Sequence, residues 1–391
     1  MSTPPSSPPL LPRAQQELRV VPTESKIIPY FTMHFARLAL LLSSFIPCSS
    51  VASTSRSRRK PIIVDTDIFS DVDDVGSLAV ANVLHNYGLA DLRGVVVNTN
   101  SKYGALATSV VNTYFGNGHI PIGALRPLTD ETFFDTYSFV LGEYAGRVAS
   151  NWPRSLEDCS ATPTPVELYR SILSAAEDRS VTLISLGFLT NLAALLDSPG
   201  DESSHVGGSS LDGSALVSAK VKELVVMGGR YPSGWEFNFA GHDPASARRV
   251  ANGWPRDVPV TYSGFELGAD VFSGEGLAHS APPDSPVLAA YQWYVGRCST
   301  TRESWDPITM LYGILGVEGS HDKLGIGKLF AYANEFGYND VAADGTNSWV
   351  NDSSVSNQHW LKFADGVTNT SVAALLTQFF SRGPLDKSCS T

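Results

Sequence analysis

The chain has 391 residues, of which 43% are hydrophobic and 10% aromatic, enough for one large folded domain or two ordinary ones. Its formal net charge is −11, with 39 acidic and 28 basic residues, which does not suit a chain that must neutralise nucleic-acid phosphates. The composition therefore excludes disorder throughout and argues against a nucleic-acid partner.

The first 60 residues differ from the rest because they are net basic. Residues 1–32 are rich in Pro and Ser and show no apolar periodicity, which predicts disorder. Met33 then begins a stretch typical of a secretory signal peptide, with Arg37, an apolar run over 38–46 and the small residues Val51-Ala52-Ser53. That run is far shorter than the ~20 residues that span a bilayer, so it predicts no stable membrane anchor.

We therefore predict a disordered extension over 1–60 with a signal peptide at 33–53, and one domain over 61–391. The signal peptide predicts secretion, with translation from Met1 or from Met33 left open. Glycosylation sequons at Asn351 and Asn369 agree with secretion, although such patterns also arise by chance. The mature chain would keep three cysteines at wide spacing, which allows at most one disulfide and no zinc site: Cys159, Cys298 and Cys389.

The body of the chain alternates apolar, β-branched runs with helical patterns. The runs predict strands at 61–66, 94–98, 181–186, 221–227 and 258–263. The helical patterns cover 75–87, 105–115, 165–177, 191–197 and 245–251, and a last helix is predicted at about 367–380. This alternation predicts an α/β fold, an open, mainly parallel, Rossmann-like twisted sheet flanked by helices in a single large domain. Ligands of such sheets bind beyond the carboxyl ends of the strands.

Five aspartates follow the first predicted strand within ten residues: Asp65, Asp67, Asp71, Asp73 and Asp74. Carboxylates so close together repel one another unless a cation neutralises them. Helix N-capping explains one or two of them but not five. Hard oxygen ligands favour calcium or magnesium over zinc or copper, so the cluster predicts a site for such a cation.

The DTD motif at 65–67, followed by Asp73-Asp74 at the start of a helix, resembles the signature of the inosine-uridine preferring nucleoside hydrolases. Three later blocks resemble that family in the same order: LISLGFLTNLAALL at 183–196, VVMGGRYPSGWEFNFAGHDPASA at 225–247 and SWDPITMLYG at 304–313. The resemblance covers about residues 61 to 380. It implies hydrolysis of the N-glycosidic bond of ribonucleosides, which gives free base and ribose.

The resemblance also implies roles for single residues. Ca²⁺ would be held by the carboxylates of Asp67, Asp74 and Asp306 and by the backbone carbonyl of Leu186, and Asp67 would also act as general base on a water. The residues expected to hold the substrate are Asp73, Asn100, Met227, Glu236 and Asn238. The expected partner is a small ribonucleoside, and a homodimer or homotetramer is expected by analogy.

Two departures from the family pattern affect these assignments. Five residues rather than three separate Asp67 from Asp73, so Asp71 is an alternative to Asp74 as ligand, and the register between Asn98 and Asn100 also stays open. Trp305 stands where many members carry a His.

A tryptophan at that position resembles the purine-specific branch, in which stacking activates the base, and it predicts a purine preference. The other interpretation of Trp305 is a core aromatic. A second stacking ring could come from Trp152 or Trp235.

Two other functions stay open from the sequence. Haloacid-dehalogenase-like phosphatases also carry a DxD motif after a strand, but no lysine closely follows Leu186 or Met227 to hold a phosphate. A secreted nucleoside- or sugar-binding protein that has lost turnover would keep the same pocket. Calcium binding without ribose release would identify that second case.

Overall fold

The structure is a computed structural model that describes residues 59–132, 143–200, 209–296, 298–319, 324–325 and 327–384. The predicted disordered extension, its signal peptide and Cys389 lie outside these residues. Cys159, which is buried, and Cys298, which is exposed, are free thiols. Within the described ranges, no helix is both long and apolar enough to cross a membrane.

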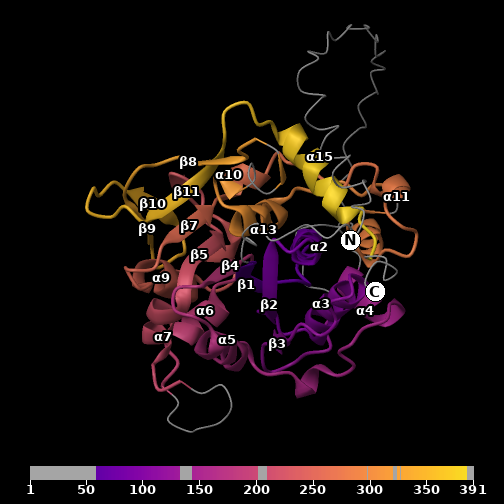
Figure 1. Cartoon of the computed structure of the whole chain (residues 1–391), viewed down its shortest axis with the longest axis horizontal. Helices are drawn as coiled ribbons and strands as arrows, with labels where there is room; N and C mark the ends of the chain where they lie inside the picture. The colour runs from indigo at the N-terminus through magenta and orange to yellow at the C-terminus, as the bar shows by residue number, and fades with distance from the viewer. Residues whose placement is uncertain are drawn as a thin grey trace, which may run out of the picture. The chain divides into compact units, whose positions relative to one another are not determined.

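An eight-stranded sheet crosses the centre of the molecule, with helices on both faces (Figure 1). Its strands, in spatial order, are β3 (Ile122–Ala124), β2 (Ala90–Val97), β1 (Lys60–Thr66), β4 (Val181–Ser185), β5 (Val221–Met227), β7 (Val260–Ser263), β11 (Gln358–Phe363) and β8 (Phe330–Tyr332). Every pair is parallel except β11 with β8, which is antiparallel. The predicted fold class, an open and mainly parallel sheet in one large domain, is confirmed.

The helices form a layer on each face of the sheet. One layer contains α5 (Pro165–Ala175), α6 (Thr190–Leu196), α7 (Gly213–Lys220) and α9 (Pro244–Gly253), whose apolar side chains share one buried cluster with β1, β4 and β5. Helix α13 (Trp305–Leu315) packs on the opposite face, against β4 and β5 (Figure 1). It approaches β4 so closely that a Cβ at Gly313 would lie 2.5 Å from the Ile184 side chain.

The remaining elements complete the second layer and the loops. Helix α2 (Asp73–Asn86) lies against α13 and against α15 (Asn369–Phe380). The others are α3 (Lys102–Tyr114), α4 (Tyr144–Asn151), η1 (Cys159–Ala161), α8 (Phe237–Ala240), α10 (Phe265–Gly268), α11 (Leu277–Ser280) and α12 (Pro286–Val295).

A separate three-stranded sheet was not predicted. It contains β6 (Ser233–Gly234), β10 (Asn347–Val350) and β9 (Tyr338–Val341), all paired antiparallel. The Asn347 side chain accepts a hydrogen bond from the Arg230 backbone N–H at 2.8 Å and donates one to the Arg230 carbonyl at 3.0 Å. This small sheet therefore holds the loop between β5 and α8.

The starts of α9, α13 and α2 show which of the nearby aspartates act as helix N-caps. Asp243 caps α9, and its side chain accepts a hydrogen bond from the Ser246 backbone N–H at 3.2 Å. Asp306 does not cap a helix, because α13 already begins at Trp305. Helix α2 begins at Asp73 after Val72, so neither Asp73 nor Asp74 serves as its cap. These carboxylates are therefore not explained by helix capping.

Candidate active site

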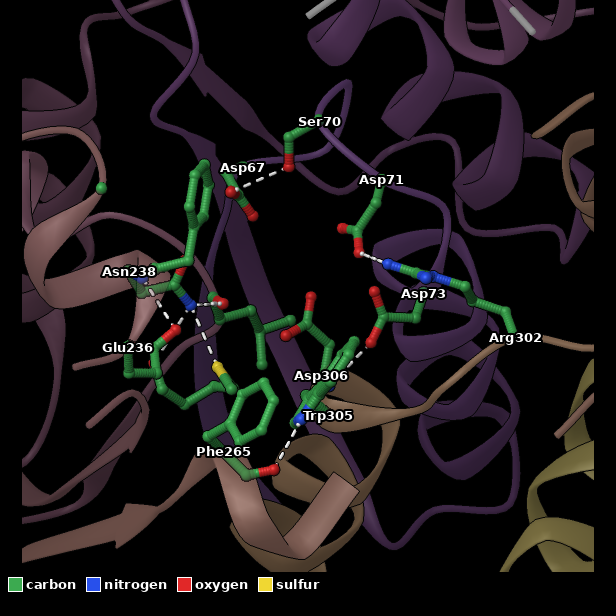
Figure 2. Close-up of a pocket in the computed structure, with 14 residues that line it drawn as sticks. Asp67, Ser70, Asp71, Asp73, Glu236, Asn238, Phe265, Arg302, Trp305 and Asp306 are labelled. Carbon is green, nitrogen blue, oxygen red and sulfur yellow. Dashed lines mark hydrogen bonds and ion pairs between the residues drawn. The ribbon is translucent and has the colours of Figure 1, made fainter. Parts of the chain in front are cut away.

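A cavity of about 430 Å³ opens at the carboxyl ends of the parallel strands, where the sheet topology places ligands (Figure 2). Nine of the residues predicted from the sequence line it, counting the alternative ligand Asp71: Asp67, Asp71, Asp73, Leu186, Met227, Glu236, Asn238, Trp305 and Asp306. Residues that sequence reasoning missed also line it, among them Ser70, Phe237, Phe265 and Arg302.

The three predicted carboxylate ligands come together beside this cavity. Asp67 follows β1, Asp74 lies in the first turn of α2 and Asp306 lies in the first turn of α13. All three are buried, and one oxygen from each lies within 4.8 Å of the others. Asp71, Asp73 and Asp74 form a second group in which one oxygen from each residue lies within 4.8 Å of the others. Asp74 therefore belongs to both groups.

The charges of this cluster are not balanced by the side chains around it. Burial raises the pKa of Asp67, Asp74 and Asp306, and neighbouring carboxylates raise it further. Thr66 donates its hydroxyl proton to Asp74 Oδ1, whereas Asp74 Oδ2 is buried with no hydrogen-bond partner among the described residues. The ligand atoms of this cluster are all oxygens, they are negatively charged, and one of them has no hydrogen-bond partner in the described part of the chain. Such a set of ligands fits a hard divalent cation.

Glycine at position 187 makes room for Asp67. A Cβ at Gly187 would lie 2.5 Å from the carboxylate carbon of Asp67, closer than real contacts allow. The preceding carbonyl, that of Leu186, accepts a hydrogen bond from Asn238 Nδ2 at 2.8 Å. The end of β4 therefore supplies both the predicted carbonyl ligand and the space that the Asp67 carboxylate occupies.

The wall opposite α2 is built around Glu236. Its carboxylate caps α8 and accepts from the backbone N–H groups of Asn238 at 2.8 Å, Gly229 at 3.0 Å and Phe239 at 3.2 Å. Asn238 Nδ2 also lies 3.0 Å from Met227 Sδ. The predicted sugar contacts Met227, Glu236 and Asn238 are therefore connected to one another and fixed by the backbone.

The pH dependence of stability should report on Glu236. Burial raises its pKa from 4.5 to about 7, although four backbone N–H groups favour the charged form. The folded state thus holds this proton more tightly than the unfolded state, so Glu236 destabilises the fold progressively as pH rises from about 4.5 through 7, by on the order of 3 kcal/mol. We expect Glu236→Gln to give a flatter plot of Tm against pH than wild type over that range.

Differential scanning calorimetry of both proteins at matched ionic strength measures this slope. Glu236→Gln also alters the N-cap of α8, but a change in Tm that is the same at every pH leaves the slope unaffected. Parallel curves for the two proteins would contradict a raised pKa for Glu236.

Trp305 lies in the cavity lining rather than in the core. Its ring stacks on that of Phe265, with centroids 5.5 Å apart and planes 29° apart, and its indole N–H donates to the Phe265 carbonyl at 2.7 Å. Neither Trp152 nor Trp235 belongs to the lining. The neighbouring ring is therefore Phe265, which follows β7 and looks like a core residue in the sequence.

The polar residues that follow β1 and β2 separate into two groups. Asn98 Nδ2 donates to Asp65 Oδ1 at 3.0 Å, and Tyr169 Oη donates to Asp65 Oδ2 at 2.9 Å, within a buried network below the cavity. Asn100 Nδ2 donates to the Pro127 carbonyl at 2.8 Å and does not line the cavity. The structure thus gives Asp65 and Asn98 a structural role, and the predicted sugar contact of Asn100 stays a prediction.

The two-residue insertion turns Asp71 toward an arginine. Asp71 Oδ2 accepts from Arg302 Nη2 at 2.9 Å. The Tyr144 hydroxyl fixes the backbone of this loop because it accepts from the Phe69 N–H at 2.8 Å and donates to the Asp71 carbonyl. Phe69 has a φ of 113°, which is strained for a side chain of its size. The insertion thus supplies a carboxylate whose partner is a cation of the protein itself.

Comparison with known proteins agrees with this site. The chain is a glycosidase of the N-ribohydrolase class. It belongs to the inosine-uridine preferring nucleoside hydrolase family, whose sequence model matches residues 62–315. This family is metal-dependent, and the acidic cluster described above could hold a metal ion. The membership contradicts the phosphatase interpretation.

Solved structures with the same fold share little sequence with the chain. A plant nucleoside hydrolase is 17% identical with a TM-score of 0.57, and covers 82% of this chain and 99% of its own. A purine-preferring ribonucleoside hydrolase from Gardnerella vaginalis is 14% identical with a TM-score of 0.56, covering 82% and 97%. The type III effector protein XopQ, complexed with adenosine diphosphate ribose, is 16% identical with a TM-score of 0.57, covering 91% and 99%. No curated protein matches the chain.

Proposed function

We propose that this protein is a calcium-dependent ribonucleoside hydrolase that prefers purine nucleosides. The observation that carries the proposal is the buried trio of Asp67, Asp74 and Asp306 beside a cavity whose other wall holds Glu236 and Asn238. Calcium suits this set better than magnesium because it accepts six to eight oxygen ligands in variable geometry, which leaves room for substrate hydroxyls and water beside the protein ligands.

The bound cation would supply Lewis acidity that makes a water more acidic. Asp67 accepts the proton of the attacking water, and Ser70 Oγ, which donates to Asp67 Oδ2 at 2.9 Å, orients its carboxylate. The water oxygen bonds to C1′ of the ribose while the bond from C1′ to the base breaks and its electron pair leaves with the base. The carboxylates around the sugar stabilise the positive charge that develops on the ribose.

We assign to Asp73 the role of holding a ribose hydroxyl. Its Oδ2 accepts from the Asp306 backbone N–H at 3.1 Å, which fixes the carboxylate against the start of α13. On the far wall, the fixed carboxylate and amide of Glu236 and Asn238 offer further partners for the sugar. The stacked pair of Trp305 and Phe265 supports the purine preference, because a two-ring base offers more surface for stacking than a pyrimidine.

A reducing-sugar assay on inosine, guanosine, adenosine and uridine tests this function. We expect ribose release that is fastest with a purine nucleoside, abolished by chelator and restored by Ca²⁺ more than by Mg²⁺. Activity that resists chelation would contradict the metal dependence. Calcium binding without ribose release from any nucleoside would instead identify a binding protein with a degenerate site.

Secretion and glycosylation are proposals that rest on sequence patterns alone. In the structure, Asn351 and Asn369 are exposed, as glycosylation requires. A homodimer or homotetramer likewise stays a proposal by analogy with the family.

A further inference from the structure

Arg302 is the one cationic side chain among the described residues that line the cavity. In Figure 2 its guanidinium points toward Asp71, across the acidic cluster from Glu236 and Asn238. Its side chain is 25% exposed, so a ligand can reach it. Besides pairing with Asp71, a cation in the cavity lining can bind a ligand that carries hydrogen-bond acceptors.

The Arg302 guanidinium has more N–H donors than its ion pairs use. Arg302 Nη2 donates to Asp71 at 2.9 Å and Nη1 donates to Glu303 Oε2 at 2.7 Å. Arg302 Nε is buried and has no hydrogen-bond partner among the described residues. Because a guanidinium carries five N–H groups in a rigid plane, donors remain after both ion pairs form, and the pairs fix its orientation.

The position of Arg302 relative to Trp305 indicates which part of a substrate it would meet. The guanidinium carbon lies 5.5 Å from the centre of the Trp305 ring. Because the guanidinium lies over the Trp305 ring and both side chains line the cavity, a base bound beside Trp305 would lie next to the guanidinium. The sugar-binding wall of Glu236 and Asn238 lies on the other side of the cavity and is itself acidic, which disfavours a phosphate on the sugar.

Arginine recognises a pair of acceptors, and among purines this pair is N7 and O6 of a 6-oxopurine. Adenine offers an acceptor at N7 but carries an amino donor at C6, and this amino group would face an N–H donor of the arginine. As the bond from C1′ to N9 breaks, its electron pair spreads over the departing purine, including N7 and O6. N–H groups aimed at those atoms bind the departing base more tightly than the bound nucleoside, which lowers the barrier.

On the premise of the proposed hydrolase, we propose that Arg302 is a catalytic residue that binds the N7 and O6 edge of the leaving base and makes 6-oxopurine nucleosides the preferred substrates. Arg302 stays protonated throughout. The departing purine takes its final proton from solvent after the bond has broken. This role takes the place of the leaving-group acid that a His at position 305 would supply.

Two substrates separate this role from a structural one. Inosine needs help with its leaving group, whereas p-nitrophenyl β-D-ribofuranoside releases p-nitrophenolate, which needs none. We expect Arg302→Gln to lower kcat/KM for inosine by about 100-fold and for the nitrophenyl riboside by less than about threefold. Arg302→Lys keeps the charge and should recover part of the loss. The matched control is Arg248→Gln, at an exposed arginine of α9, which should change neither.

Several results would overturn the role of Arg302. These are an equal loss on both substrates in Arg302→Gln, an unchanged rate with inosine, and faster hydrolysis of adenosine than of inosine by wild type. A loss confined to inosine 5′-monophosphate would show a phosphate contact instead. Failure of the proposed function looks different, because wild type would then release neither ribose from inosine nor p-nitrophenolate from the riboside.

Discussion

Asp67→Asn is expected to lower kcat for ribose release by about 10⁴-fold in a protein that stays folded. Asp67 is the one residue to which both a ligand role and the general-base role are assigned, and its carboxylate lies in the buried trio with Asp74 and Asp306. An amide of the same shape cannot take a proton from water and binds a cation more weakly. Ser70 can still donate to the side-chain oxygen of asparagine, so the local structure should persist.

Single-turnover and steady-state ribose release at saturating Ca²⁺ measure this loss, and saturation separates catalysis from weaker metal binding. The matched control is Asp243→Asn, because Asp243 caps α9 and does not line the cavity. Its kcat should stay within about twofold of wild type. A kcat for Asp67→Asn within tenfold of wild type would remove Asp67 as the general base.

The sequence predicted the parts of the site that lie next to a strand end. A buried run before the DTD motif places Asp67 at the edge of the sheet by local pattern alone. Asp306 is different, because no local signal links a residue at the start of α13 to one after β1. The resemblance to the nucleoside hydrolases linked them, and the packing of α13 against α2 brings them together.

The residues missed by sequence reasoning have side chains whose position depends on tertiary structure. Phe265 is a single aromatic residue after β7, and Arg302 lies beside Glu303 in a polar loop, so neither belongs to a recognisable motif. Their contact with the cavity depends on how two loops from distant strands meet. Asp65 shows the opposite error, because its place in the aspartate cluster suggested a shared role, although it faces a buried network with Tyr169.

Elements beyond the family match support the site from outside. Helix α15 packs on α2, where a Cβ at Gly76 would lie 2.7 Å from the Phe380 ring. Strand β10 holds the loop before Glu236 through Asn347. The described C-terminal elements α15 and β10 therefore support both walls of the cavity, although none of their residues lines it.

Asp74→Asn should change stability in opposite directions with and without metal. In chelator, the variant loses one of several buried carboxylates that repel one another, so its Tm should exceed that of wild type at pH 8. Wild type should gain about 5–10 °C when calcium reaches about 1,000 times its Kd, because ligand binding to the folded state alone adds about 4 kcal/mol. The variant should gain little of this, since it lacks a ligand.

Calorimetry of both proteins in chelator and over a calcium series tests both expected changes, the higher Tm of the variant without metal and its smaller gain in Tm with calcium. Asp365→Asn, at an exposed carboxylate after β11, controls for net charge. Its Tm in chelator and its Tm with calcium should both stay within about 1 °C of the wild-type values. A Tm for metal-free Asp74→Asn below that of wild type would mean that repulsion is not what limits the metal-free protein. A full calcium response in the variant would assign the ligand role to Asp71 and Asp73 instead, and the ion pair of Asp71 with Arg302 would then have to open when the cation binds.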